Sequence, residues 1–370
     1  MKKKYLGIIL VAALALVSKH WLYPKPELPE ASPISTRSIT DMKQRCFRVQ
    51  DPLDRIGLLG GPTGQVAFIL GIQDRLCAVT NTLRMSKLVQ EIYPPISDLP
   101  GPRTTAGNIN IEELIQSRPQ IVVTGDIDGS IVLEKTRIPV AFLDDSMGEG
   151  VKDIKREIQF YGYLFRAEDR ARAYTEFLDK ILALVLDRTG NIPDNKRKTV
   201  FQGYSPSRLV TLGGDTFMQE RIEMAGCLNA AKSVTTIGKR TGLHLGLGEV
   251  SMEQVLDWNP DILIINFGSP QDVYADPQWR HIRAVREKHI HAQPARIFIF
   301  NRPTAESAVI FPLWLASIAY PKRFQDVDLP GIVKQFYREI MDFQLSDQQA
   351  EDILKGHYEF KMMKGIKHGQ

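Results

Sequence analysis

One phrase of the sequence occurs twice, and the two copies lie 141 positions apart. Residues 111–123 read IEELIQSRPQIVV, and residues 252–264 read MEQVLDWNPDILI. Each copy predicts a short amphipathic helix that ends near a proline, followed by a buried apolar strand. A capping-box pattern opens both copies, at Asn110 and at Ser251. Helix–proline–strand units also recur by chance in α/β proteins. The matched register and caps nevertheless favour two similar lobes, with a ligand cleft between them.

The first residues have the pattern of an export signal. Lys2, Lys3 and Lys4 precede an apolar run from Tyr5 to Val17. This run is shorter than the roughly 20 residues of a membrane-spanning helix. No clean small-residue cleavage site follows it, so residues 1–18 are predicted to be either a cleaved signal peptide or a membrane anchor. Residues 19–37 are predicted to be a linker. The rest of the chain is expected to be periplasmic or otherwise extracytoplasmic.

Composition and charge exclude some functions. Residues 1–18 hold three Lys and no acid, so the remainder carries 44 basic against 43 acidic residues, a formal charge of +1. This balance gives no reason to expect a nucleic-acid partner. The three cysteines include no C-x-x-C pair, and Cys77 and Cys227 lie in apolar surroundings, so both are predicted to be core residues. Neither a metal site nor a cofactor is expected.

The periodicity along the chain predicts an α/β fold. Two Rossmann-like lobes with mostly parallel sheets are expected, joined by one long backbone helix. The predicted segments are an N-terminal lobe at 38–148, the bridging helix at 149–190, a C-terminal lobe at 191–324, a C-terminal helical extension at 325–355 and a flexible tail at 356–370.

The order of several motifs resembles a known family. These motifs are R-I-G-L-L-G-G at 55–61, the two copies of the phrase on either side of the long helix, Trp279 with Ala284-Val285, and Arg302-Pro303 with Glu306 and Trp314. Over roughly residues 38–322 the chain resembles the class III periplasmic substrate-binding proteins of ABC importers. The resemblance implies a rigid bilobal binding protein without enzymatic activity. Such a protein would deliver its ligand to a membrane permease and its ATPase.

The resemblance also implies how the chain docks. Family members present one exposed acid on each lobe to arginines of the permease. In this sequence the N-lobe position falls on Glu112 and the C-lobe position on Glu306. Both acids also suit the first turn of a helix, where the helix dipole favours negative charge.

Ligands of open α/β sheets bind beyond the carboxyl ends of the strands. This rule selects the loops at 60–64, 125–130, 204–208, 213–216, 267–269 and 301–302. Arginine is suited to anions, and tyrosine can ligate ferric iron or stack on a chelate. The predicted ligand-binding residues are Thr63, Gly64, Asp126, Tyr204, Arg208, Asp215 and Arg302.

The ligand stays open at this level. An iron chelate or similar metal complex is the first expectation, with cobalamin, haem or a molybdate- or tungstate-type oxyanion as alternatives. An exported α/β enzyme and a membrane-tethered sensor domain are the competing classes, although no G-x-S-x-G, Walker or H-E-x-x-H motif is present. The chain is expected to be a monomer.

Overall fold

The computed structural model describes residues 35–60, 62–104, 107–144, 150–235, 247–295, 297 and 303–356. The chain forms two compact units, residues 1–37 with 50–52 and residues 38–49 with 53–370. In the first unit, the Asp51 N–H donates to the Ser35 carbonyl at 2.9 Å, and Arg37 pairs with Asp51 at 3.6 Å. Strands β1 (Thr36–Thr40) and β2 (Cys46–Gln50) pair as a hairpin.

A parallel four-stranded sheet forms the first lobe of the second unit. Its order is β4-β3-β5-β6, and every residue of its strands is buried, as expected where helices cover both faces. The strands are β3 (Ile56–Leu58), β4 (Leu76–Val79), β5 (Ile121–Thr124) and β6 (Val140–Phe142). The accompanying helices are η1 (Pro62–Gln65), α2 (Val66–Ile69), η2 (Gln73–Arg75), α3 (Asn81–Arg84), α4 (Lys87–Ile92), η3 (Pro94–Asp98), α5 (Ile111–Gln116) and α6 (Asp126–Lys135).

The second lobe is built on a mixed sheet of order β10-β8-β7-β11-β12, with β9 paired to β7. Strands β7, β9, β11 and β12 are parallel to one another, whereas β8 pairs antiparallel with β7 and β10 pairs antiparallel with β8 at one edge. The strands are β7 (Thr199–Ser205), β8 (Arg208–Thr211), β9 (Leu228–Asn229), β10 (Gly248–Glu249), β11 (Ile262–Ile265) and β12 (Ile290–Ala292). The helices are η4 (Asp194–Lys196), α9 (Phe217–Met224), α10 (Met252–Trp258), α11 (Pro270–Ala275), η5 (Pro277–Trp279) and α12 (Arg283–Arg286).

The repeated phrase forms the same elements in both lobes, as predicted. The first copy is α5 followed by β5, and the second is α10 followed by β11. Ser251 and Gln254 form the complete capping box. The first copy has only half of one, because Glu113 Oε1 instead accepts the N–H of Gly101 at 3.0 Å.

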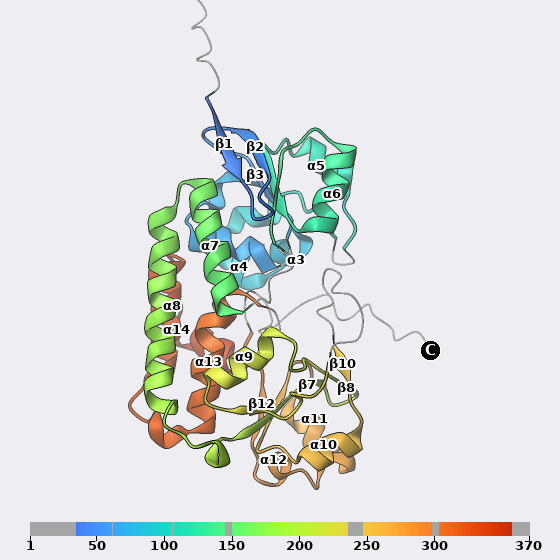
Figure 1. Cartoon of the computed structure of the whole chain (residues 1–370), viewed down its shortest axis with the longest axis vertical. Helices are drawn as coiled ribbons and strands as arrows, with labels where there is room; N and C mark the ends of the chain where they lie inside the picture. Colours follow the sequence, from blue (N-terminus) through green and yellow to red (C-terminus); the bar gives the residue numbers. More distant parts are fainter. Residues whose placement is uncertain are drawn as a thin grey trace, which may run out of the picture. The chain divides into compact units, whose positions relative to one another are not determined.

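The long helical pattern between the lobes is divided into two helices. Helix α7 (Val151–Phe165) ends at Arg166, whose φ of 55° is left-handed, and α8 (Glu168–Thr189) begins two residues later. The two helices run side by side (Figure 1), and Lys155 of α7 pairs with Asp179 of α8. The bridging helix is therefore α8, and it starts at residue 168 rather than at the predicted residue 149. The sequence gives no sign of this break, because the left-handed residue that ends α7 is an arginine and not the glycine or proline that usually marks a helix end.

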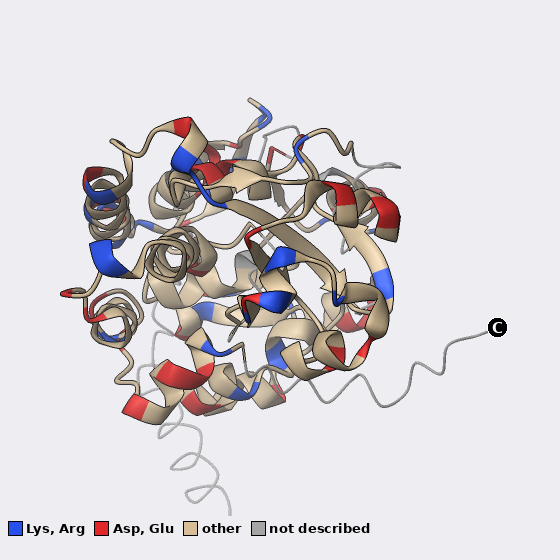
Figure 2. Cartoon of the chain, turned by 90° about the horizontal axis from the view of Figure 1, so that it is seen from below, with Lys and Arg blue, Asp and Glu red and all other residues tan. Residues whose placement is uncertain are grey.

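Helices after residue 303 complete the core. They are α13 (Ala305–Ala319), which contains Pro312, η6 (Pro321–Arg323), α14 (Leu329–Ile340) and α15 (Asp347–Leu354). One hydrophobic cluster runs from the first lobe through α7, α8 and α13 to α15. Within the described ranges, no helix is both long and apolar enough to cross a membrane. Basic and acidic residues are mixed over the face seen from below (Figure 2).

Candidate functional site

Two aromatic rings and an arginine meet where parallel strands of the second lobe end. Tyr204 lies near the end of β7, and Phe267 follows β11; their ring centroids are 4.7 Å apart. Arg208 begins β8 and places its Cζ 5.1 Å from the centre of the Tyr204 ring. The backbone fixes this arrangement, because the Phe267 N–H donates to the Tyr204 carbonyl at 2.9 Å. The structure thus brings together two of the predicted residues, Tyr204 and Arg208.

The Arg208 guanidinium is available for a ligand. Arg208 is exposed, and its side chain makes no ion pair or hydrogen bond within the ranges that the structure describes. The Tyr204 ring supports one face of the guanidinium, a cation–π contact worth about 0.5–1 kcal/mol at an exposed site. Five N–H donors in a planar fork remain to bind an oxygen-rich anion.

A cluster of three amides lies next to this aromatic pair. Gln202 precedes Tyr204 by two residues on β7, and its Nε2 donates to Asn266 Oδ1 at 2.6 Å and to Gln293 Oε1 at 3.1 Å. Gln202 and Gln293 are 1% and 2% exposed. Among the described residues, Gln202 Oε1, Asn266 Nδ2 and Gln293 Nε2 have no hydrogen-bond partner. Buried polar atoms of this kind are normally satisfied, so the cluster is suited to hold a water or ligand oxygen.

Sequence reasoning did not identify this amide cluster, and it selected the loop at 267–269 without naming Phe267 as a ligand-binding residue. Asn266 and Phe267 directly follow the second copy of the phrase, and Gln202 interrupts an apolar strand. A polar residue inside a buried strand is the sequence signal from which the cluster could have been predicted.

The first lobe places two predicted residues at the start of its first helical segment. Thr63 and Gly64 belong to η1, which follows β3. A Cβ on Gly64 would lie 2.5 Å from Leu83 Cδ2, so close packing explains this glycine without a ligand. Beside it, Gln65 is fully buried, and its Oε1 accepts the N–H of Glu306 at 3.1 Å.

The expected loop at 125–130 is helical. Gly125 is the N-cap of α6, and Asp126 is its first residue. Asp128 in the first turn pairs with the buried Arg103, so this acid has a structural partner. Gly129 is needed inside the helix because the Phe142 ring packs against it and would overlap any added Cβ.

Asp215 is exposed in the turn between β8 and α9. The preceding glycines have a packing role: a Cβ on Gly213 would overlap the Val234 carbonyl oxygen, and one on Gly214 would overlap that of Lys232. Arg302 lies outside the described residues.

The two expected docking acids differ in exposure. Glu112 is exposed in the first turn of α5. Glu306 also lies in the first turn of its helix, α13, but it is 0% exposed. Its carboxylate accepts a hydrogen bond from the hydroxyl of Tyr337 on α14. Glu306 is therefore not the exposed acid that docking requires. The C-terminal extension covers it, which the sequence position alone did not show.

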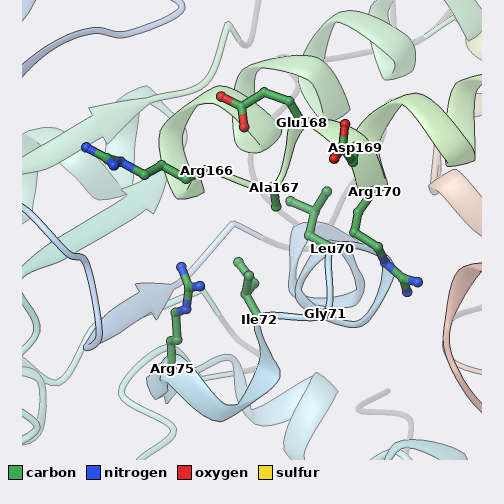
Figure 3. A pocket seen from close by; sticks show the side chains of 9 residues that line it. All are labelled: Leu70, Gly71, Ile72, Arg75, Arg166, Ala167, Glu168, Asp169 and Arg170. Atoms are coloured by element: carbon green, nitrogen blue, oxygen red, sulfur yellow. The ribbon is translucent and has the colours of Figure 1, made fainter.

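A cavity of about 300 Å³ lies away from the candidate site, at the amino end of β4 and the junction of α7 and α8. Figure 3 shows Arg75 and Arg170 on opposite sides of this hollow. Arg75 donates to the Phe165 carbonyl at 3.0 Å, and Arg170 donates to the carbonyls of Ile69 and Ile340. These cations hold elements together, so we place the functional site at the strand ends instead.

The described residues contain no group of three His, Cys, Asp or Glu side chains that could hold a metal ion. Cys77 and Cys227 are buried, as predicted, and Cys46 is exposed. Burial raises the pKa of Cys77 to about 11 and that of Cys227 to about 12, so both thiols are inert core groups.

Known proteins share this architecture. The molybdate-binding protein MolA of Haemophilus influenzae is 24% identical over 333 residues, covering 83% of this chain and 92% of that protein. Three solved structures have the same fold. A periplasmic solute binding protein from Veillonella parvula has a TM-score of 0.73 at 21% identity, covering 87% of this chain and 97% of its own.

The second structure is MolA bound to molybdate, with a TM-score of 0.70 at 23% identity and coverage of 84% and 99%. The third is CeuE of Helicobacter pylori in complex with Ni-His, with a TM-score of 0.66 at 19% identity and coverage of 86% and 98%. The sequence pattern of one family, described as periplasmic binding protein, matches residues 63–297, more than half of the chain. Together with the two-lobed α/β architecture, this match shows that the chain belongs to the periplasmic binding protein family.

Proposed function

We propose that this chain is the extracytoplasmic substrate-binding component of an ABC importer and that its ligand is a small anion. The observation that carries the ligand class is the guanidinium of Arg208, held on the Tyr204 ring at 5.1 Å with its donors unused by the described residues. The family is a class of substrate-binding proteins. A purely binding role, without catalysis, therefore agrees with the site.

A molybdate- or tungstate-type oxyanion fits this chemistry best. Arginine and amide N–H groups are hydrogen-bond donors, and a tetrahedral oxyanion is an acceptor on every side. The relative MolA is named for molybdate binding, which supports the same class here. The iron chelate expected first remains the second candidate, because the Tyr204–Phe267 pair offers an aromatic surface for a larger chelate. Haem or cobalamin would need the same surface.

Docking on the permease is proposed through one exposed acid on each lobe. Glu112 serves the first lobe. For the second lobe we assign Glu253, because 253 − 112 gives the spacing of 141 positions between the two copies of the phrase, and both acids are exposed in the first turn of their helices. An ion pair at each lobe would fix orientation, although each exposed pair contributes only about 0–1 kcal/mol. A monomer is proposed to act with the permease and its ATPase.

Residues 1–18 are proposed to direct export, and they lie outside the described residues. Whether they are cleaved or retained decides between a free binding protein and an anchored one. N-terminal sequencing of the protein recovered from producing cells separates these two states.

Thermal unfolding of residues 35–370 with a ligand panel tests the function. The panel consists of molybdate, tungstate, sulfate, a ferric tricatecholate, haem, cobalamin and nickel-histidine. A ligand at 100 times its Kd stabilises the folded state by about 2.7 kcal/mol and should raise the midpoint by several degrees. We expect molybdate or tungstate to give that shift and sulfate a smaller one. A shift by haem or cobalamin alone would overturn the anion proposal, and no shift from any compound would overturn the binding role itself.

A further inference from the structure

Three amide side chains at the ends of adjacent strands leave a mixed set of hydrogen-bonding atoms unused. Gln202 lies on β7, Asn266 directly follows β11, and Gln293 directly follows β12. Gln202 Nε2 donates to both of the other amides, at 2.6 Å to Asn266 Oδ1 and at 3.1 Å to Gln293 Oε1. Gln202 Oε1, Asn266 Nδ2 and Gln293 Nε2 remain, shielded from solvent and without a partner in the described part of the chain. The unused set is thus one acceptor and two donors.

The unused set stays mixed when the amides rotate. A half-turn of all three amide groups exchanges each oxygen with its nitrogen and keeps both contacts at Gln202. Gln202 Oε1 then accepts from Asn266 and Gln293, and the unused atoms become one donor and two acceptors. In either orientation, a ligand atom that only accepts hydrogen bonds leaves a buried acceptor unsatisfied, which costs stability. An oxygen of a fully ionised oxyanion is such an atom, so it does not complete the cluster.

A hydroxyl oxygen does complete the cluster. It has two lone pairs and at least one proton, so it can accept from Asn266 Nδ2 and Gln293 Nε2 and donate to Gln202 Oε1. About three hydrogen bonds to otherwise unsatisfied polar groups are typical of a buried water molecule. A water in this position keeps its second proton, which it can donate to a ligand.

Backbone hydrogen bonds fix the positions of the amides. The Asn266 N–H donates to the Gly203 carbonyl at 3.1 Å, and the Gln293 N–H donates to the Ile265 carbonyl at 2.8 Å. These bonds continue the parallel ladder of β7, β11 and β12 beyond its last paired residues. The three side chains are therefore held together before a ligand arrives, and little ordering is left for binding to cost.

We propose that the three amides form a subsite for one hydroxyl oxygen, which links them to the anion bound by Arg208. This proposal rests on the proposed function, because Gln202 lies two residues before Tyr204, whose ring supports Arg208. Two sources supply such an oxygen. A retained water would donate its remaining proton to the anion, so that three neutral amides act as one donor. Alternatively, a singly protonated oxyanion such as hydrogenphosphate would place its own hydroxyl there.

Crystal structures of the full chain without ligand, with molybdate and with phosphate distinguish these sources. Molybdate has no proton at neutral pH, whereas phosphate keeps at least one. A retained water would be present without ligand and would stay when molybdate binds. A ligand hydroxyl would occupy the subsite only in the phosphate complex. In both cases one oxygen lies within hydrogen-bonding distance of all three amides, and its absence from every crystal would overturn the proposal.

Affinity measurements test the link between the subsite and the anion. Gln202→Met keeps the length of the side chain but removes the amide. We expect the Kd for the anion seen in the crystals to rise about tenfold, which corresponds to about 1.4 kcal/mol. Gln271→Met on α11 is the matched control, because it changes an exposed glutamine, and its Kd should equal that of the parent. If thermal unfolding shows that Gln202→Met does not fold, Asn266→Leu at a half-buried position replaces it, with an expected rise of about threefold or more.

The crystal structure of the folded variant separates binding from a structural effect. The oxygen should be absent, and Tyr204 and Arg208 should keep their positions. A Kd within about twofold of the parent after loss of the oxygen would refute the link to the anion. Displacement of Arg208 would assign the weaker binding to the altered site and would refute the link as well. An ordered oxygen in a parent chain that binds neither anion would confirm the subsite and refute only the proposed ligand class.

Discussion

Replacement of Arg208 is the sharpest test of the candidate site. Arg208→Ala removes a fork of donors that can make two charge-assisted hydrogen bonds to an oxyanion. Each such bond contributes about 1.5–3 kcal/mol in a protected site, and less here because the residue is exposed. The cation–π contact with Tyr204 supplies preorganisation that is lost as well. We expect a total loss of about 1.4–2.7 kcal/mol, which is a tenfold to hundredfold rise in the Kd.

Isothermal titration with molybdate measures this loss. Arg208→Lys should fall between the parent and the alanine variant, because lysine keeps the charge but not the planar fork. Arg286→Ala on α12 is the control, since it removes an exposed arginine away from the strand ends. Both alanine variants should unfold within about 1 kcal/mol of the parent, which allows for the cation–π contact that Arg208→Ala removes. Equal affinities for Arg208→Ala and Arg286→Ala would refute the reasoning, because the loss would then reflect net charge and not the site.

Two further predictions concern stability. Burial, and secondly the charge of His289, lower the pKa of His291 to about 4. Since an unfolded histidine titrates near 6.5, protonation favours the unfolded chain, and the free energy of unfolding should fall by up to about 3 kcal/mol as the pH drops from 6.5 to 4. Urea titrations across this range should show a weaker dependence in His291→Gln; an unchanged dependence would assign it to other groups. Gly213→Ala should cost about 2–3 kcal/mol or more, because its methyl group would meet the Val234 carbonyl oxygen. Ser207→Ala on the nearby exposed turn is its control, and equal urea midpoints would contradict the clash.

The fold was predictable where local patterns and burial agree. The repeated phrase located α5 with β5 and α10 with β11. The break between α7 and α8 was not predictable, because it depends on a left-handed arginine at 166 and on Gly162, where a Cβ would lie 2.7 Å from that of Ala171. Such a close approach between helices is a tertiary contact, and the hydrophobic periodicity of the sequence does not predict tertiary contacts.

The candidate site was predictable only in part, for the same physical reason. The rule on strand ends identified Tyr204 and Arg208 because both lie in a hairpin at the end of β7. It did not identify Gln202 and Gln293, which are 91 positions apart and meet only when β7, β11 and β12 align. The prediction that Glu306 is an exposed docking acid was wrong for a related reason, because Tyr337, from a helix about thirty residues later, covers its carboxylate.

Arg221 offers a last test of what the fold tolerates. This α9 residue is 0% exposed, and all three guanidinium nitrogens are without a hydrogen-bond partner among the described residues. Burial lowers the pKa of Arg221. Glu220 Oε2 lies 3.6 Å from Arg221 Nη1, and this oxygen also accepts a hydrogen bond from the Val151 N–H.

A buried charge with so few partners costs free energy that one long ion pair does not offset. Arg221→Met should therefore raise the free energy of unfolding by about 1–4 kcal/mol, because Glu220 keeps the Val151 N–H and part of its exposure to water. Arg221→Ala should be less stable than the methionine variant, since it leaves a void. Urea unfolding measures both. A methionine variant less stable than the parent would show that the guanidinium has stabilising partners in solution. A stabilised variant with impaired ligand affinity would instead show that the charge is retained for binding at a cost in stability.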